Sequence, residues 1–185
     1  ASRVNAKLDA ASNWPEAIYR NLKRSSIGQV GFVPDAGHSR LIELCVEDPG
    51  IEDVVLTTEE EGVGLVAGAA LGGQRCALLM QSSGVGNCVN MLSLLGAADF
   101  PFFTLVTMRG EYAEFNRWQR PMGQATQAAL ELMGIHVMRA SRPEEVEQVV
   151  SAGFDADAAG ADGQARGANR RRRRSAAVTR ASFVA

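Results

Sequence analysis

Three consecutive glutamates, Glu59–Glu61, are the side chains of this 185-residue chain whose type and placement best suit proton chemistry. They open a segment of small residues, 62–73, in which glycine recurs. Each glycine inside a helix costs roughly 0.5–1 kcal/mol against alanine, so these glycines need a reason other than helix propensity. Close approach of another backbone or of a ligand is the usual reason. The structural alternative is that the acids complement the positive end of the helix dipole.

A second segment, Met80–Asn87, places serines and glycines directly after an apolar run. Residues Ser82–Asn87 would form a tight turn that lets the backbone approach a ligand, because Gly84 and Gly86 are free to adopt positive φ. The alternatives are an ordinary strand-to-helix turn and a dinucleotide loop, and the missing third glycine disfavours the loop. Together, the two segments favour a functional role for one of the three glutamates.

Four further polar residues follow predicted strands and are candidates for the substrate side: Asp35, His38, Asn87 and Arg109. Arg109 could pair with a carboxylate, sulfonate or phosphonate in bidentate fashion, although a surface ion pair is the alternative. His136 lies in a short apolar strand, where a structural role is the better interpretation.

Alternating helices and strands must position these residues. The pattern predicts helices at 13–25, from 39, and at 59–72, 86–97, 126–133 and 143–155, with strands at 27–33, 53–56, 75–81, 102–108 and 135–138. Continuous apolar strands separated by helices indicate a mostly parallel sheet covered on both faces. We therefore predict a doubly wound α/β domain with its ligand site beyond the carboxyl ends of the strands.

Composition narrows the class of protein. The chain is 46% hydrophobic and 22% charged, which is ordinary for a globular protein. It has no apolar run near the ~18 residues of a membrane span and no signal pattern at its start, so we expect a cytoplasmic protein. Residues 1–160 carry a net charge of −8, which argues against nucleic acid as a partner. Cys45, Cys76 and Cys88 lie far apart in apolar patterns, which favours core thiols over a disulfide frame or a zinc site.

The C-terminal segment departs from this pattern. We divide the chain into a leader (1–12), a domain (13–157) and an arginine-rich tail (158–185) that includes Arg170–Arg174. Such a tail buries too little apolar area to offset its ordering entropy, so we expect disorder. The arginines could bind an anionic surface, or the tail could be a frame-shifted reading of an expected last strand, but a solvated tail is the simplest interpretation.

Thr58–Gly68 followed by Met80–Asn87 resembles the pyrimidine-binding (PYR) domain of thiamine diphosphate enzymes. The resemblance extends over roughly residues 13–155 and is closest to sulfopyruvate decarboxylase alpha subunits and to the N-terminal half of phosphonopyruvate decarboxylases. It implies the thiamine diphosphate-binding fold of PYR type. Two motifs at the right separation, both at strand ends, make it more specific than either motif alone.

The resemblance also implies roles for particular residues. A glutamate at the end of the second strand faces N1′ of the cofactor's aminopyrimidine ring, which assigns that catalytic role to Glu59, or to Glu60 if the register slips by one. The cofactor-binding residues would be Glu59, Ser82, Ser83, Gly84, Val85, Gly86 and Asn87. Substrate contacts would come from Asp35, His38 and Arg109, and this chain would supply no metal ligand.

The family holds the diphosphate and a magnesium ion through a Gly-Asp-Gly motif in a second domain, and this chain contains no such motif. The resemblance therefore implies half a site, completed by a diphosphate-domain (beta-type) subunit in a homodimer or hetero-oligomer. The expected activity is thiamine diphosphate-dependent decarboxylation of a small 2-oxo acid similar to sulfopyruvate or phosphonopyruvate. The alternatives are a non-catalytic binding or regulatory module of the same fold, and a dinucleotide-binding domain.

Overall fold

The computed structural model describes residues 13–111, 113–161 and 175–180. Its helices are α2 (Trp14–Arg24), α3 (Ser39–Val46), α4 (Glu59–Leu71), α5 (Ser82–Cys88), α6 (Ser93–Ala98), α7 (Arg120–Leu132) and α8 (Val146–Ala161). Its strands are β1 (Ile27–Phe32), β2 (Glu52–Val55), β3 (Arg75–Gln81), β4 (Phe102–Thr107), β5 (His136–Ala140) and β6 (Ser175–Arg180). Short 3-10 turns lie at Ala36–His38, Arg117–Gln119 and Pro143–Glu145.

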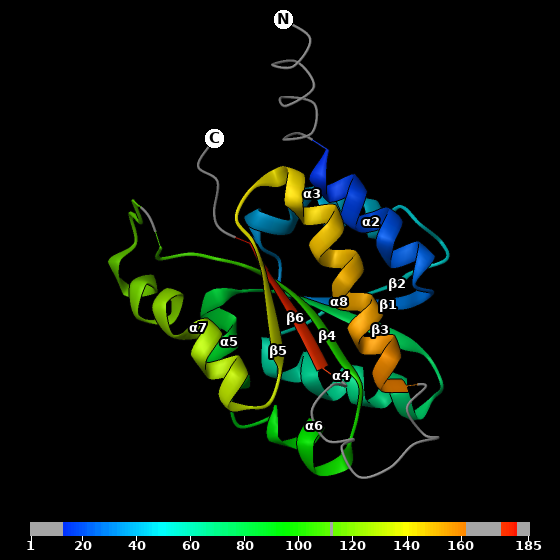
Figure 1. Cartoon of the computed structure of the whole chain (residues 1–185). Helices are drawn as coiled ribbons and strands as arrows, with labels where there is room; N and C mark the ends of the chain where they lie inside the picture. Colours follow the sequence, from blue (N-terminus) through cyan, green and yellow to red (C-terminus); the bar gives the residue numbers. More distant parts are fainter. Residues whose placement is uncertain (1–12, 112, 162–174, 181–185) are drawn as a thin grey trace, which may run out of the picture.

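The strands form one six-stranded sheet in the order β2-β1-β3-β4-β6-β5, and every described pair is parallel. Helices cover both faces, with α2, α3 and α8 on one side and α4 to α7 on the other (Figure 1). The predicted doubly wound α/β fold is confirmed. None of the described helices combines the length and the apolar character that a membrane span requires.

The side chains of the central strands alternate between the two faces, as a period of two residues requires. In β3, Ala77 and Leu79 pack towards α2 and α8, whereas Leu78 and Met80 pack towards α4 and α5. Because both faces are buried, β3 and β4 read as continuous apolar runs. This two-sided core fixes the level at which the strands end and hence the edge where polar side chains collect.

Close packing explains one of the glycines of α4. A Cβ added to Gly62 would lie 2.3 Å from Leu78 Cδ1, so a side chain there would push α4 away from the sheet. At Gly64 and Gly68, an added Cβ would meet no atom within 4 Å among the described residues. The close approach that we expected is therefore present at Gly62, while Gly64 and Gly68 face open space.

The structure corrects two predictions about local conformation. Residues Ser82–Cys88 form helix α5 rather than a tight turn, because their small side chains let the segment pack between α4 and α7. The single helix expected at 86–97 is divided into α5 and α6 (Ser93–Ala98). The predicted catalytic glutamates still lie at the first turn of α4, as expected.

The structure also corrects the prediction for the C-terminal segment. Helix α8 continues to Ala161, and Ser175–Arg180 forms a strand with neighbours on both sides, β4 and β5. Pairing on two sides compensates for the weak apolar pattern of this strand. The expected disorder is therefore wrong for 158–161 and 175–180, and the domain does not end at 157. The leader 1–12 and the run Arg170–Arg174 lie outside the described residues.

Candidate functional site

Three strand ends are joined by one carboxylate, that of Asp35. The hydroxyl of Thr107, the last residue of β4, donates to Asp35 Oδ2 at 2.7 Å. The amide Nε2 of Gln81, the last residue of β3, donates to Oδ1 at 3.0 Å. His38 Nδ1 lies 3.5 Å from Oδ2. Asp35 follows β1, so this cluster ties the carboxyl ends of β1, β3 and β4 together.

The carboxyl group of Asp35 is held in its ionised form. Burial by itself raises its pKa, since the side chain is only 8% exposed. The close approach of His38 and the hydrogen bond from Thr107 outweigh burial and hold the pKa of Asp35 well below its usual range. His38 is itself 3% exposed. These two predicted substrate residues therefore lie at the expected edge of the sheet, in a buried polar cluster, and their contact with substrate stays a prediction.

Glu59, the first residue of α4, lies against helix α5. Its Oε2 atom accepts a hydrogen bond from Asn87 Nδ2 at 3.1 Å. A Cβ added to Gly84 would be 2.3 Å from Glu59 Cδ and 2.4 Å from Oε1, so only glycine at that position leaves room for the carboxyl group. The fold thus brings together three residues that the sequence motifs had singled out, Glu59, Gly84 and Asn87.

The other two glutamates of the run have different surroundings. Glu61 accepts a hydrogen bond from the backbone N–H of Thr57 at 2.8 Å and so satisfies a free donor at the start of α4. Glu60 is exposed. Glu59 is thus the glutamate of the run for which the structure gives contacts to Gly84 and Asn87 of the second motif, and the assignment of the catalytic role to Glu59 or Glu60 stays a prediction.

Two serines of the second motif hold α5 in place. The buried Ser82 hydroxyl accepts a hydrogen bond from the backbone N–H of Arg109 at 2.9 Å, which joins the start of α5 to the end of β4. The hydroxyl of Ser83 donates to Gln81 Oε1 at 2.9 Å. Because Gln81 also contacts Asp35, a path of hydrogen bonds runs from α5 to the strand-end cluster.

Val85 and Gly86 face inward. The side chain of Val85 is fully buried in the core between the sheet and α4 to α7. An added Cβ on Gly86 would lie 3.1 Å from Met122 Sδ, so glycine there lets α5 and α7 pack closely. The geometry therefore gives Val85, Gly86 and Ser82 supporting contacts within the fold, and their contact with a cofactor stays a prediction.

Arg109 forms an ion pair, the alternative that the sequence left open, with a partner that the sequence did not identify, Glu114. Its Nε and Nη2 atoms donate to Glu114 Oε2 and Oε1 at 2.8 and 2.6 Å. The same carboxylate accepts the backbone N–H groups of Gly110 and Asn116. Hydrogen bonds from Arg109 and then from Asn116 lower the pKa of Glu114 to about 2. A substrate anion would have to bind Arg109 alongside this ion pair, so the substrate role of Arg109 stays a prediction.

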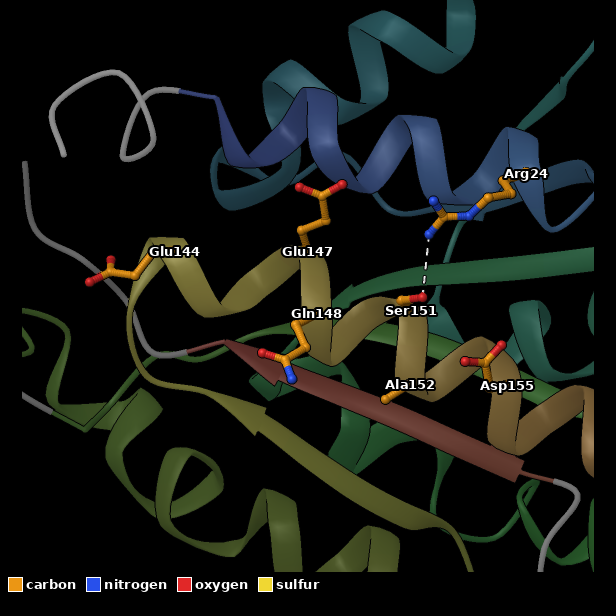
Figure 2. Close-up of a pocket in the computed structure, with 7 residues that line it drawn as sticks. All are labelled: Arg24, Glu144, Glu147, Gln148, Ser151, Ala152 and Asp155. Carbon is orange, nitrogen blue, oxygen red and sulfur yellow. Dashed lines mark hydrogen bonds between the residues drawn. The ribbon is translucent and has the colours of Figure 1, made fainter. Parts of the chain in front are cut away.

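An open groove lies elsewhere, between α2 and α8 (Figure 2). Arg24 Nη2 donates to Ser151 Oγ at 3.3 Å and joins the two helices, while Glu144, Glu147 and Asp155 make the lining acidic. The groove contains none of the predicted site residues. It is lined by residues of α2, of α8 and of the turn Pro143–Glu145 that follows β5.

No protein-family profile matches the chain. It is 35% identical over 139 residues to the sulfopyruvate decarboxylase subunit alpha of Methanococcus maripaludis, covering 75% of this chain and 83% of the relative. It is 38% identical over 136 residues to the subunit of the same name from Methanothermobacter thermautotrophicus, covering 73% of this chain and 82% of the relative. A phosphonopyruvate decarboxylase of Streptomyces viridochromogenes is 36% identical over 105 residues, 26% of that protein.

Among solved structures, a 2-oxoglutarate:ferredoxin oxidoreductase from Magnetococcus marinus matches 90% of this chain and 28% of its own, with a TM-score of 0.61 and 11% identity. At that identity the match supports the fold alone. The sequence relatives confirm the predicted resemblance and favour a decarboxylase subunit over a dinucleotide-binding domain. Their identity and coverage show that the chain belongs to the family of sulfopyruvate decarboxylase alpha subunits.

Proposed function

We propose that this chain is the aminopyrimidine-binding subunit of a thiamine diphosphate-dependent decarboxylase that acts on a small 2-oxo acid with a second anionic group, such as sulfopyruvate. The observation that carries the proposal is the contact of Glu59 with Gly84 and Asn87. It joins the two motifs of the PYR domain at the sheet edge where ligands of doubly wound folds bind.

The residues at this edge suit the aminopyrimidine part of the cofactor. A carboxyl group can share a proton with a ring nitrogen. Glu59 places a half-buried carboxyl group at the carboxyl edge of the sheet. Asn87 Nδ2 donates a hydrogen bond to one oxygen of the Glu59 carboxyl group and so fixes the orientation of that group. Gly84 keeps the carboxyl group against α5. The side chain is thereby positioned before any ligand arrives, which reduces the cost of ordering it during catalysis.

Bound thiamine diphosphate would supply an electron sink for the charge released as carbon dioxide leaves. This chain would contribute the carboxyl group of Glu59, which holds a proton at N1′ of the aminopyrimidine ring. The cluster around Asp35 would keep the strand ends, and through Gln81 and Ser83 the start of α5, in a fixed relation. Relatives of this chain are named subunit alpha, which supports a separate beta-type subunit that would hold the diphosphate and its magnesium ion.

The outer face of α4 supports assembly with another chain. Residues 62–71 are all apolar or glycine, and a helix that is apolar around its circumference is normally covered on all sides. Here Leu71 is 77% exposed, and a Cβ added to Gly64 or Gly68 would meet no atom of the described residues within 4 Å. We infer that a homodimer or hetero-oligomer contact covers this face, where the glycines would permit close helix packing.

The test is co-expression with a diphosphate-domain subunit and measurement of carbon dioxide release from sulfopyruvate and phosphonopyruvate. Glu59→Gln should lower kcat by about 10²–10⁴-fold, because the amide cannot hold the proton at the ring nitrogen. Glu60→Gln, one position along the same helix, should retain activity. Full activity of Glu59→Gln would remove the catalytic assignment, and loss of activity in Glu60→Gln alone would transfer it to the neighbouring residue.

A further inference from the structure

The segment after β4 exposes two aromatic side chains. Phe115 is 93% exposed and Trp118, in the short turn Arg117–Gln119, is 69% exposed. Aromatic residues in contact with water at this level are costly to leave uncovered, and phenylalanine and tryptophan are enriched where protein partners dock. Two of them three positions apart in one segment mark a candidate contact surface.

The exposure of these side chains does not come from a loosely held loop. The buried carboxylate of Glu114, which directly precedes Phe115, accepts four hydrogen bonds, two from Arg109 and one each from the backbone of Gly110 and Asn116. Its side chain is 5% exposed. The described residues on either side of Phe115 are therefore held in place by Glu114, which lowers the cost of immobilising them when a partner docks.

Further contacts fix the two ends of the segment. Arg139 of β5 makes a bidentate ion pair with Glu111, with both N···O distances 2.6 Å. Where the segment meets α7, a Cβ added to Gly123 would lie 2.0 Å from Arg109 O, so the start of the helix packs directly against the end of β4. These contacts pair Arg109 with Glu114 and Glu111 with Arg139, so they hold the described residues that flank the aromatic pair.

The aromatic pair belongs to the same edge of the sheet as Glu59. The segment begins where β4 ends, and the backbone of Arg109 is bonded to Ser82 at the start of α5. Met122, in the first turn of α7, packs on Gly86 of α5, the helix that contacts Glu59. In Figure 1 the segment projects beyond α5 and α7 at the carboxyl ends of the strands.

We propose that Phe115 and Trp118 are the docking site for the diphosphate-domain subunit, an inference that rests on the proposed function. A subunit that completes the cofactor site must bring its diphosphate half to the edge where Glu59 lies. In doing so it would approach α5 and the segment beside it, and it would bury the aromatic pair. Binding of the partner at Phe115 and Trp118 would thus also complete the cofactor site.

The experiment measures association of the full chain with a diphosphate-domain subunit by sedimentation and calorimetry, without substrate. The double variant Phe115→Ser, Trp118→Ser should bind at least about 30-fold more weakly, as expected when central aromatic contacts are lost. Its thermal unfolding should match the parent, because both side chains are exposed. The control is Leu132→Ser, which changes an 81% exposed residue at the far end of α7 and should bind as the parent does.

Association of the double variant within threefold of the parent would overturn the docking site. So would self-association of the parent chain that the double substitution abolishes, because it would assign the surface to a second copy. Failure of the proposed function has a different signature: Glu59→Gln would retain decarboxylation, whatever the double variant does to association. Glu59→Gln is expected to bind the partner as the parent does, which separates docking from proton transfer.

Discussion

Replacing Gly84 by alanine would displace the carboxyl group of Glu59 without changing its chemistry. The added Cβ would lie 2.3 Å from Glu59 Cδ, whereas ordinary contacts begin at 3.4 Å. The carboxyl group must therefore move by about 1.1 Å or more. Because the obstructing atoms are the far end of a flexible side chain, the backbone of α5 can stay in place while the Glu59 carboxyl group, the proposed catalytic group, moves away.

The substitution should separate activity from stability. A misplacement of about 1 Å at a reacting group can cost about 10²-fold in rate, so kcat/KM for decarboxylation by the assembled enzyme should fall by about that factor. Alanine is favoured over glycine in a helix by about 0.5–1 kcal/mol, which offsets the cost of moving Glu59. The free energy of unfolding, measured in urea, should therefore change by less than about 1 kcal/mol.

The matched control is Gly96→Ala in helix α6, where an added Cβ meets no atom within 4 Å among the described residues. It should leave kcat/KM unchanged. Wild-type activity in Gly84→Ala would refute the claim that the position of Glu59 matters. A fall in activity that tracks an equal fall in stability would refute the claim that Gly84 acts through Glu59.

Three further outcomes follow from the structure. Asp35→Asn should lower the free energy of unfolding at pH 7 by about 1.5–3 kcal/mol, since it removes the charge that the strand-end hydrogen bonds satisfy. The pKa of Asp35 is depressed in the folded state, so the stability that its charge contributes is present above about pH 4 and is lost as the pH falls further. The stability difference between the parent and Asp35→Asn should therefore shrink below about pH 4. A difference that stays constant in urea titrations down to about pH 2.5 contradicts this prediction. Burial raises the pKa of the Cys45, Cys76 and Cys88 thiols to about 12. A disulfide reagent at pH 8 should therefore label these thiols only after denaturant is added, because the reactive thiolate is scarce in the folded chain. Rapid labelling of the native chain argues against their burial. A chain ending at residue 161 lacks β6 and leaves β5 without its neighbouring strand, so it should aggregate on size exclusion and lose cooperative thermal unfolding; cooperative unfolding near the parent's temperature contradicts the strand order.

Elements with strong local patterns could be predicted from the sequence. The strand Arg75–Gln81 has the predicted bounds because its apolar run is continuous and both of its faces are buried. Helix α7 begins at Arg120, six residues before the predicted start. The prediction began too late because Pro121 and Gly123 make the first turn of the helix look like a loop. Gly123 is needed there to let the helix pack on the backbone of Arg109. A tertiary contact thus overrode the local signal.

The candidate site was partly predictable for a similar reason. Glu59, Gly84 and Asn87 belong to two motifs at strand ends, and parallel strands bring their carboxyl ends to one edge. The contacts of Asp35 with Gln81 and Thr107 span 46 and 72 residues. They depend on β1, β3 and β4 being adjacent, an order that no local pattern contains.

The edge that holds Glu59 also presents Phe115 and Trp118, but different contacts support the two features. Glu59 is positioned by α5, through Gly84 and Asn87, whereas the aromatic segment is held by the carboxylate of Glu114. A defect in one can therefore leave the other intact. Since the proposed reaction needs a complete cofactor site, loss of docking should be recoverable at high partner concentration. Loss of the Glu59 carboxyl group should not be recoverable at any partner concentration, so the concentration dependence of activity distinguishes the two roles.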